Sequence, residues 1–255
     1  MNPLVTAFKK GFERSGIKPS RISMPSDVLF EPEVVKDLGV DYFHVTRGRA
    51  IAFGTGLKLA NPALRVVAVA GDLMTIGGNH FVHGGRRNME VLVICINNYV
   101  YRKIAGKTAP LVTVKFSPYS TFEEPFNIPH LGNSCGAIYT ARWTALHIEE
   151  LAESIAHGLT KRGLAVIEVL VPGPDYYNGI GTWRDELVKF YHENSEKRDG
   201  EMPRNVGITG ESKIIVGEFT DKEMPPFIDT YNKQLSAVLK DKFTPYGQTN
   251  GGQNG

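Results

Sequence analysis

The length, composition and charge of the chain exclude several classes of protein. Its 255 residues are 42% hydrophobic and 22% charged, as in one large α/β domain or one domain with an appendage. The formal net charge is only +2 and the basic residues are scattered, so no nucleic-acid partner is expected. No apolar run reaches the roughly 20 residues of a membrane span, and the N-terminus lacks a signal-peptide apolar region. The sequence therefore predicts a soluble, cytoplasmic protein with no membrane partner.

The N-terminal quarter of the chain is predicted to combine helices with short strands. Residues 2–16 carry apolar residues at helical spacing and stop at Gly16, which indicates an amphipathic helix. Residues 19–45 contain three prolines and are interpreted as a loop with short strands. Residues 47–62 are predicted to be helical, and the Asn-Pro pair at 61–62 ends this helix.

The middle of the chain contains two aliphatic runs, at residues 65–71 and 90–97. Neither run alternates with polar residues, which is typical of parallel strands buried on both faces. Residues 76–88 are expected to form the helix between them. Residues 99–125 show no clear helix and are expected to form a long loop, and loops of that length inside a compact domain are usually functional.

The C-terminal half continues the alternation of helices and strands. The pattern recurs over residues 128–172, and residues 182–197 are predicted to form an amphipathic helix. This order predicts an α/β fold, a doubly wound, mostly parallel sheet with helices on both faces. Residues 1–200 are assigned to this domain, and residues 201–240 to a C-terminal extension that contacts a partner. Residues 241–255, rich in Gly, Asn and Gln, are expected to be a disordered tail.

Polar residues stand at the ends of the two aliphatic runs. The first run ends in Gly71 and Asp72, and the second in Asn97 and Asn98. Ligands bind beyond the carboxyl ends of such strands, Asp and Asn oxygens suit Mg²⁺, and a glycine lets the backbone approach a phosphate. One helix and one return strand separate Asp72 from Asn98, so both are expected at one metal–diphosphate clamp. The alternative is that Asp72 caps the next helix and the two asparagines form a turn.

This region resembles a known family, the β subunits of the 2-oxoacid:acceptor oxidoreductases, which include the pyruvate and 2-oxoglutarate ferredoxin oxidoreductases. That β subunit carries the diphosphate-binding half of a thiamine diphosphate site. The matching stretches follow the family's order over residues 43–178. They are FHVTRGRAIAFGTGLKLANP (43–62), AGDLMTIGGNHFVHGGRRN (70–88), NNYVYRKIAGKTAP (97–110), FNIPHLGNSCGAIYTAR (126–142) and VIEVLVPGPDYYN (166–178).

The resemblance implies a magnesium site and a set of cofactor contacts. Asp72 and Asn98 would bind Mg²⁺ through their side chains, and Val100 through its backbone carbonyl. His44 matches the histidine of the family's Phe-His pair and is the candidate catalytic residue. The other residues expected around the cofactor are Gly71, Leu73, Gly77, Gly78, Asn79, His80 and Tyr101. The alternative for His44 and His80 is a hydrogen-bonded interior histidine.

Four further polar residues have less specific interpretations. His83 and Arg86 are expected to support the site from behind or to lie on the surface. Arg49 and Lys58 would bind an anionic substrate, contact the partner chain, or simply be solvated.

By the same resemblance, the reaction is the oxidative decarboxylation of a 2-oxo acid to acyl-coenzyme A. An α subunit would supply the pyrimidine-binding domain, in a heterodimer or a dimer of heterodimers. Electrons would pass to an acceptor protein or a redox subunit. The chain alone is expected to be inactive.

The sequence departs from the family at three places. Many relatives bind an iron–sulfur cluster through four cysteines, whereas this chain has only Cys95 and Cys135, and Gly173 stands where the last ligand is expected. No cluster is therefore expected in this chain. The turn after Asp72 is shorter than the family's, with Leu73 in place of a glycine. Lysines stand in the 103–107 segment, near the expected substrate entrance.

Three functions remain open at this point. The first is an oxidative enzyme whose electrons leave through a partner. The second is a non-oxidative thiamine diphosphate-dependent decarboxylase or carboligase, which the missing cysteines favour. The third is a degenerate subunit that acts as a scaffold, which the altered turn allows.

Overall fold

The structure is a computed structural model of the full chain. It describes residues 3–71, 73–74, 76–97, 100–104, 107–110, 126–171, 191, 193–203 and 213–247, with only the backbone described for 100–104 and 107–110. Among the helices of this part of the chain, none is long and apolar enough to span a membrane.

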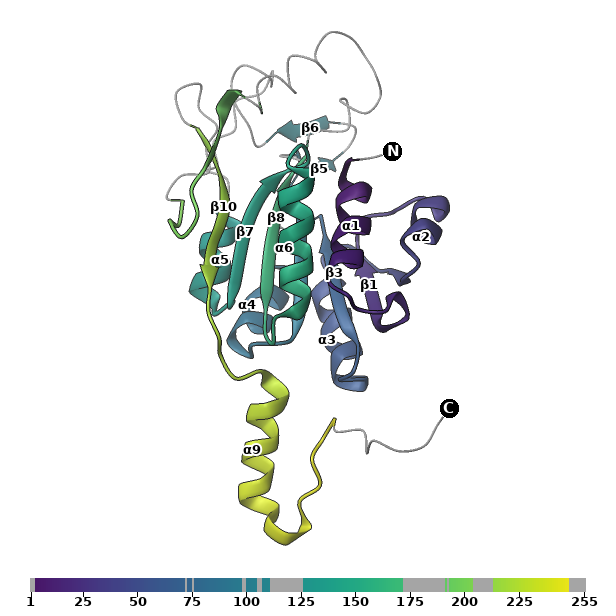
Figure 1. The fold of residues 1–255 in the computed structure, drawn as a ribbon, viewed down its shortest axis with the longest axis vertical. Helices are drawn as coiled ribbons and strands as arrows, with labels where there is room; N and C mark the ends of the chain where they lie inside the picture. Colours follow the sequence, from purple (N-terminus) through teal and green to yellow (C-terminus); the bar gives the residue numbers. More distant parts are fainter. Residues whose placement is uncertain are drawn as a thin grey trace.

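Within the described residues, one eight-stranded sheet forms the centre of the molecule (Figure 1). The strand order is β2-β1-β3-β4-β8-β7-β10-β9. Neighbouring strands from β2 to β7 are parallel, β10 is antiparallel to β7, and β9 is parallel to β10. The strands are β1 (Ile22–Ser26), β2 (Asp41–His44), β3 (Arg65–Ala70), β4 (Val91–Asn97), β7 (Tyr139–Thr144), β8 (Ala165–Leu170), β9 (Ser195–Lys197) and β10 (Ile214–Asp221).

Helices cover both faces of this sheet. On one face lie α1 (Pro3–Arg14), α2 (Pro32–Leu38) and α6 (Ile148–Thr160). On the other lie α3 (Ala50–Ala60), α4 (Gly78–Arg86) and α5 (Ile128–Cys135). The predicted doubly wound, mostly parallel α/β fold is confirmed.

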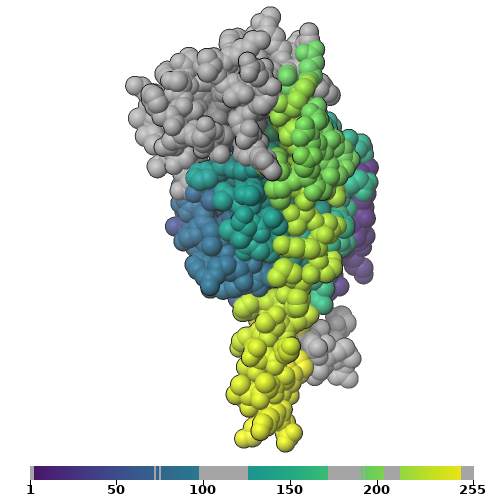
Figure 2. All heavy atoms as spheres, turned by 90° about the vertical axis from the view of Figure 1, so that its left-hand side faces the viewer, coloured from purple at the N-terminus to yellow at the C-terminus, as the bar shows by residue number. Residues whose placement is uncertain are grey.

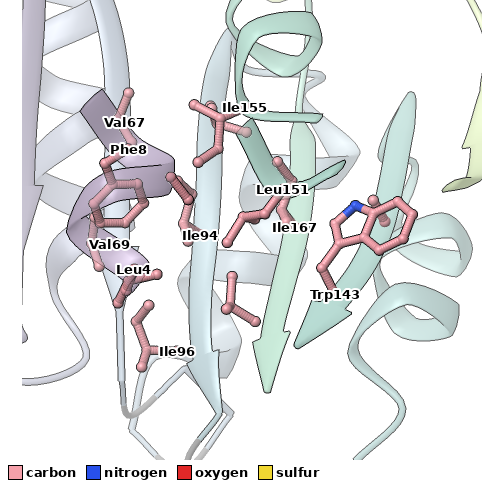
Figure 3. Packing of buried hydrophobic residues seen from close by; sticks show 14 of the residues in the cluster. Leu4, Phe8, Val67, Val69, Ile94, Ile96, Trp143, Leu151, Ile155 and Ile167 are labelled. Carbon is pink, nitrogen blue, oxygen red and sulfur yellow. The ribbon is translucent and has the colours of Figure 1, made fainter. Parts of the chain in front are cut away.

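Two hydrophobic clusters, one on each face, hold the helices against the sheet. In the first, Phe8 of α1 and Ile155 of α6 pack over the central strands, beside Ile94 and Ile167 (Figure 3). Alternate strand residues, such as Val93, belong to the second cluster. The central strands are therefore buried on both faces, which is why their sequences show no polar alternation. Each fully buried aliphatic side chain contributes roughly 1.5–3 kcal/mol.

The confirmed sequence predictions are those with a strong periodic pattern. The helices predicted at 2–16, 47–62 and 76–88 are α1, α3 and α4, and the strands predicted at 65–71 and 90–97 are β3 and β4.

Three segments differ from the prediction. Residues 19–45 hold the expected short strands but also α2, which starts at Pro32, ends at Leu38 and is followed by the C-cap residue Gly39 with φ of 66°. In the predicted loop 99–125, Val100–Ile104 (β5) and Lys107–Pro110 (β6) pair as an antiparallel hairpin.

The third difference concerns the helix predicted at 182–197. Of its described residues, 191, 193 and 194 are helical as predicted, whereas 195–197 form β9 because they pair with Ile214–Val216 of β10. This tertiary pairing outweighs the local helical pattern. Residues 182–190 and 192 lie outside the described part of the chain.

The C-terminal segment contributes both to the sheet and to an arm outside it. β10 adds a strand beside β7, and the helix α9 (Phe227–Leu239) then extends beyond the body of the molecule (Figures 1 and 2). The short 3-10 helix η2 (Lys240–Lys242) follows α9. Residues up to 247 fold back on α9, where Tyr246 exchanges backbone hydrogen bonds with the side chain of Asn232. Residues 248–255 lie outside the described part.

Two adjacent glycines of α4 provide a matched test of the α4–α5 packing. A Cβ built on Gly85 would lie 2.6 Å from the carbonyl oxygen of Cys135, whereas one built on Gly84 would make ordinary contacts at 3.6 Å with Ile51. Alanine is favoured over glycine inside a helix by about 1 kcal/mol. Gly84→Ala is therefore expected to be neutral or stabilising, and Gly85→Ala to lower the thermal unfolding midpoint by several degrees. Circular dichroism melts of both variants measure this, and equal melting would contradict the close approach of α4 and α5.

Candidate functional site at the carboxyl edge of the sheet

The strand order reverses between β1 and β3, and the region beyond the carboxyl ends of these two strands is called the crevice below. From β1 the chain moves outward to β2 through α2, and it then returns across β1 to β3 through α3. The strand order therefore reverses between β1 and β3, and right-handed crossovers in the two directions place α2 and α3 on opposite faces of the sheet. In doubly wound sheets, ligands bind beyond the carboxyl ends of the strands at such a reversal.

Asp27 connects the loops around this crevice. It follows β1 directly and is only 8% exposed. Its Oδ1 accepts a hydrogen bond from the amide of Gly71 at 2.7 Å, and its Oδ2 accepts one from the amide of Gly48 at 2.7 Å. Bonds of this length to a carboxylate are among the stronger hydrogen bonds in proteins. The ends of β1 and β3 and the loop before α3 are therefore fixed to one another.

The loop before α3 also touches the turn that leads into α4. Gly48 has φ of 67°, and a Cβ there would lie 2.9 Å from the amide nitrogen of Gly77. A Cβ on Gly77 would lie 2.9 Å from the carbonyl oxygens of Gly48 and Leu73. Only glycine allows this approach of two backbones. Arg49 supports the contact by donating from its guanidinium to the carbonyls of Gly48 and Ile76.

The N-terminus of α4 opens onto this edge without a side-chain cap. Gly77 occupies the N-cap position, so Asp72 does not, and that alternative is wrong for α4. The first N–H groups of a helix have no partner within the helix. Together with the helix dipole, they form a site suited to an anion such as a diphosphate.

His80 lies in the first turn of α4 and has an unusual environment. Its Nε2 is buried and has no hydrogen-bond partner among the described residues. Burial, assisted by the positive charges of Arg49 and His83, lowers the pKa of His80. The imidazole is therefore neutral at physiological pH, with one ring nitrogen available for a hydrogen bond.

The other predicted residues are distributed around this edge. His44 ends β2 in register with Ser26 and is exposed, so it is not an interior histidine. The side chain of Leu73 is 2% exposed and packs in the second hydrophobic cluster. A contact of Leu73 with the cofactor would therefore be made by its backbone. Gly78 is half-buried and Asn79 is exposed at the start of α4.

The interpretation of Lys58 as a binding or solvated residue is wrong. Its side chain is buried, and its ammonium donates to the carbonyls of Pro62 and Leu64 at 2.8 and 3.0 Å. Burial lowers the pKa of Lys58, and the nearby charge of Glu90 opposes that shift. Lys58 thus closes the C-terminal end of α3, at the edge of the sheet opposite the crevice. His83 and Arg86 both lie on the surface.

At the end of β4, Asn97 is held by a buried ion pair. Its Nδ2 donates to Oε1 of Glu168 at 2.8 Å, and Nε of Arg142 donates to Oε2 of Glu168 at 2.6 Å. The exposed fractions of the Arg142 and Glu168 side chains are 2% and 0%. The three residues come from β4, β8 and β7, and Arg142 and Glu168 are register partners.

The same ion pair extends to the C-terminal segments. The guanidinium of Arg142 also donates to the side-chain oxygen of Asn127 and to the carbonyl of Ile215 in β10. The amide of Asn127 in turn donates to the carbonyl of Pro203. One hydrogen-bond network therefore joins the end of β4 to Pro203 and to Ile215 of β10.

Of the three predicted metal ligands, the structure describes only the backbone of Val100. Asp72 and Asn98 lie outside the described residues. The backbones of Val100 and Tyr101 begin β5, three residues after the end of β4 at Asn97. Gly71 and Asn97, the residues that precede the two side-chain ligands, are described, and each is fixed by a buried carboxylate.

Sequence reasoning did not select Asp27, Arg142 or Glu168, although signals for them exist. Asp27 is a polar residue directly after a strand, the same signal that selected Asp72. Glu168 interrupts the apolar run AVIEVL, and a charge inside a buried strand requires a partner of opposite charge.

Comparison with known proteins agrees with this geometry. The family model described as "Thiamine pyrophosphate enzyme, C-terminal TPP binding domain" matches residues 31–169, so the class of protein is a thiamine diphosphate enzyme. A "2-oxoglutarate synthase subunit KorB" of Methanothermobacter marburgensis is 39% identical over 237 residues, covering 89% of this chain and 82% of its own. The subunit of the same name from Methanocaldococcus jannaschii is 37% identical and covers 93% of this chain and 91% of its own.

A solved structure has the same fold. The 2-oxoglutarate:ferredoxin oxidoreductase of Magnetococcus marinus aligns with a TM-score of 0.71 at 23% identity, covering 92% of this chain and 84% of its own. The chain belongs to the family of 2-oxoacid:ferredoxin oxidoreductase β subunits, which are components of thiamine diphosphate-dependent oxidoreductases.

Proposed function

We propose that this chain, together with an α subunit, catalyses the oxidative decarboxylation of a 2-oxo acid to acyl-coenzyme A. The observation that carries the proposal is the uncapped N-terminus of α4, placed at the strand-order reversal beside Gly71 and Gly77. Relatives named 2-oxoglutarate synthase point to 2-oxoglutarate as the first substrate to test.

The residues at this edge fit a diphosphate. The backbones at Gly48 and Gly77 leave no room for a Cβ, and the buried Nε2 of His80 lacks a partner among the described residues. In the proposal, the amides at the start of α4 bind the diphosphate, and Asp72, Asn98 and the carbonyl of Val100 hold Mg²⁺. When bound, thiamine diphosphate supplies the nucleophilic carbon and the electron sink that decarboxylation of a 2-oxo acid requires.

His80 and His44 have separate proposed roles. His80 is neutral because its pKa is lowered, so it binds the cofactor by a hydrogen bond rather than by charge. His44 ends the outer strand β2 and is exposed, and in the proposal it faces the substrate and the partner chain.

Two exposed apolar surfaces support binding of a partner polypeptide. Phe43 and Phe53, next to His44, are 39% and 42% exposed, with ring centroids 5.5 Å apart. On α9, Val238 is 77% exposed and Tyr231 is 44% exposed. Apolar groups of this kind on a surface commonly mark protein interfaces. In the proposal, the α subunit covers the first surface and so completes the active site.

Electron transfer in the proposal uses a centre outside this chain. The full sequence contains two cysteines, and both are free thiols in the structure, which also accords with a reducing cytoplasm. Cys95 is buried within β4, and burial raises its pKa well above the ordinary value. A cysteine-ligated cluster needs more thiolates than this chain supplies. The electrons therefore pass to a cluster or flavin of a partner, or directly to an acceptor protein.

Co-purification with the partner tests the proposal. The purified complex is expected to bind thiamine diphosphate only with Mg²⁺, and to reduce an electron acceptor when given a 2-oxo acid and coenzyme A. Its visible spectrum identifies a cluster or a flavin. Release of CO₂ without reduction of any acceptor would instead establish the non-oxidative enzyme. No Mg²⁺-dependent cofactor binding would establish the scaffold.

A further inference from the structure

Two buried carboxylates flank the strands that lead to the proposed metal ligands. Asp27 follows β1 and Glu168 lies in β8, and in the sheet these strands enclose β3 and β4. Each carboxylate accepts a hydrogen bond from the end of the enclosed strand beside it. The bond partners, Gly71 and Asn97, directly precede Asp72 and Asn98 in the sequence.

The Asp27 carboxylate restrains the β3 end through the backbone. Its two oxygens accept from the amides of Gly71 and Gly48, both at 2.7 Å, and the amide of Asp27 donates to the carbonyl of Val69. The two N–H groups donate to different oxygens of the carboxylate, and an amide side chain in the same orientation would present an NH₂ donor in place of one of these acceptors. The direction in which the chain leaves β3 is therefore set by Asp27.

The Glu168 carboxylate restrains the β4 end through a side chain. One of its oxygens is bound by Arg142, and the other accepts from the amide of Asn97 at 2.8 Å. Because Glu168 is fully buried and held by the ion pair, the Asn97 amide has a fixed acceptor. The direction in which the chain leaves β4 is set in the same way.

We infer that Asp27 and Glu168 are positioning residues for the magnesium–diphosphate site, one for each side-chain ligand. The inference rests on the proposed function, because it assigns the carboxylates to the site proposed there. Partners of this kind fix the orientation of metal ligands, and their loss commonly weakens metal binding by about 10–100-fold.

Two variants test the two anchors. Asp27→Asn replaces one carboxylate oxygen with an NH₂ group, which would face the backbone N–H of Gly71 or Gly48 and cannot accept its hydrogen bond. Asn97→Ala removes the donor to Glu168 and leaves the Arg142–Glu168 pair in place. In complex with the partner subunit, each variant is expected to bind thiamine diphosphate with Mg²⁺ about tenfold more weakly or worse. If Asp27→Asn does not accumulate as folded protein, Asp27→Ser, which keeps one acceptor, takes its place.

Hydrogen exchange separates positioning from general stability. Peptides covering residues 69–74 in the first variant and 95–98 in the second are expected to exchange about tenfold faster without cofactor, as after loss of a local hydrogen bond. Peptides from β7 and β8 should keep their protection. Faster exchange throughout the sheet would show a merely structural role and overturn the inference.

Matched controls are available far from the crevice. Asp199→Asn alters an exposed carboxylate that accepts from the amide of Glu218, and Asn61→Ala removes an amide that accepts from the amide of Ala63. Neither should change cofactor binding. Wild-type affinity in the Asp27 and Asn97 variants would overturn the inference. Failure of the wild-type complex to bind cofactor would refute the proposed function instead. Hydrogen exchange of the peptides at the ends of β3 and β4 would then still decide whether Asp27 and Glu168 hold these strand ends.

Discussion

Replacing Arg142 with methionine is expected to lower the free energy of unfolding by about 3–5 kcal/mol, because it leaves the carboxylate of Glu168 buried without its cation. The Nε–Oε2 distance is 2.6 Å and the two side chains are 2% and 0% exposed, so water cannot replace the lost partner. Urea denaturation of the purified chain, followed by circular dichroism, measures the change.

A double variant distinguishes an unpaired charge from a packing defect. Arg142→Met combined with Glu168→Met removes both charges, and it is expected to regain much of the lost stability, since apolar side chains often replace a buried ion pair without loss. As a control, Lys10→Met breaks an exposed ion pair with Glu149 and should change stability little. A double variant no more stable than Arg142→Met would indicate that the shape of the side chains, not their charge, dominates.

The fold was predictable wherever local pattern and tertiary environment agree. β3 and β4 carry apolar residues on both of their faces because both faces are covered, so the sequence alone identifies them as central strands. β9 is different, since Ser195–Lys197 has no apolar character and extends only because β10 pairs with it. α2 is intermediate, because its start and stop signals are present but only Leu38 is buried.

The position of the candidate site, at the carboxyl ends of the strands, was predictable from the sequence. The hydrogen bonds that Asp27 and Glu168 make there were not. Glycines at 71 and 77 are recognisable from the sequence, and in the structure Gly77 lies against the backbones of Gly48 and Leu73, whereas Gly71 lies against the side chains of Val28 and Asp27. The partners of Asp27 are 21 and 44 residues away in sequence, and Glu168 lies 71 residues from Asn97. Contacts between such distant residues depend on the order of the strands, which no local pattern encodes.

The proposed metal ligand makes the second large prediction. Asp72→Asn keeps the shape of the side chain and removes its negative charge, and Mg²⁺ strongly prefers charged oxygen ligands. Loss of a residue that only orients a metal ligand commonly weakens metal binding by about 10–100-fold. Because Asp72 is itself a proposed ligand, the variant complex is expected to require at least about 100-fold more Mg²⁺ for thiamine diphosphate binding. Isothermal titration with the cofactor at several Mg²⁺ concentrations measures this.

The control for Asp72→Asn is Asp41→Asn, which changes an exposed carboxylate at the start of β2. Asp41 therefore lies at the amino ends of the parallel strands, whereas the crevice lies at their carboxyl ends. The Asp41→Asn variant should bind cofactor like the wild type. Helix capping cannot explain a loss at Asp72, because Gly77 holds the N-cap position of α4 and asparagine is as good a cap as aspartate. If Asp72→Asn keeps the wild-type Mg²⁺ requirement, another residue supplies the charged ligand, and the positioning role of Asp27 toward residue 72 fails with it.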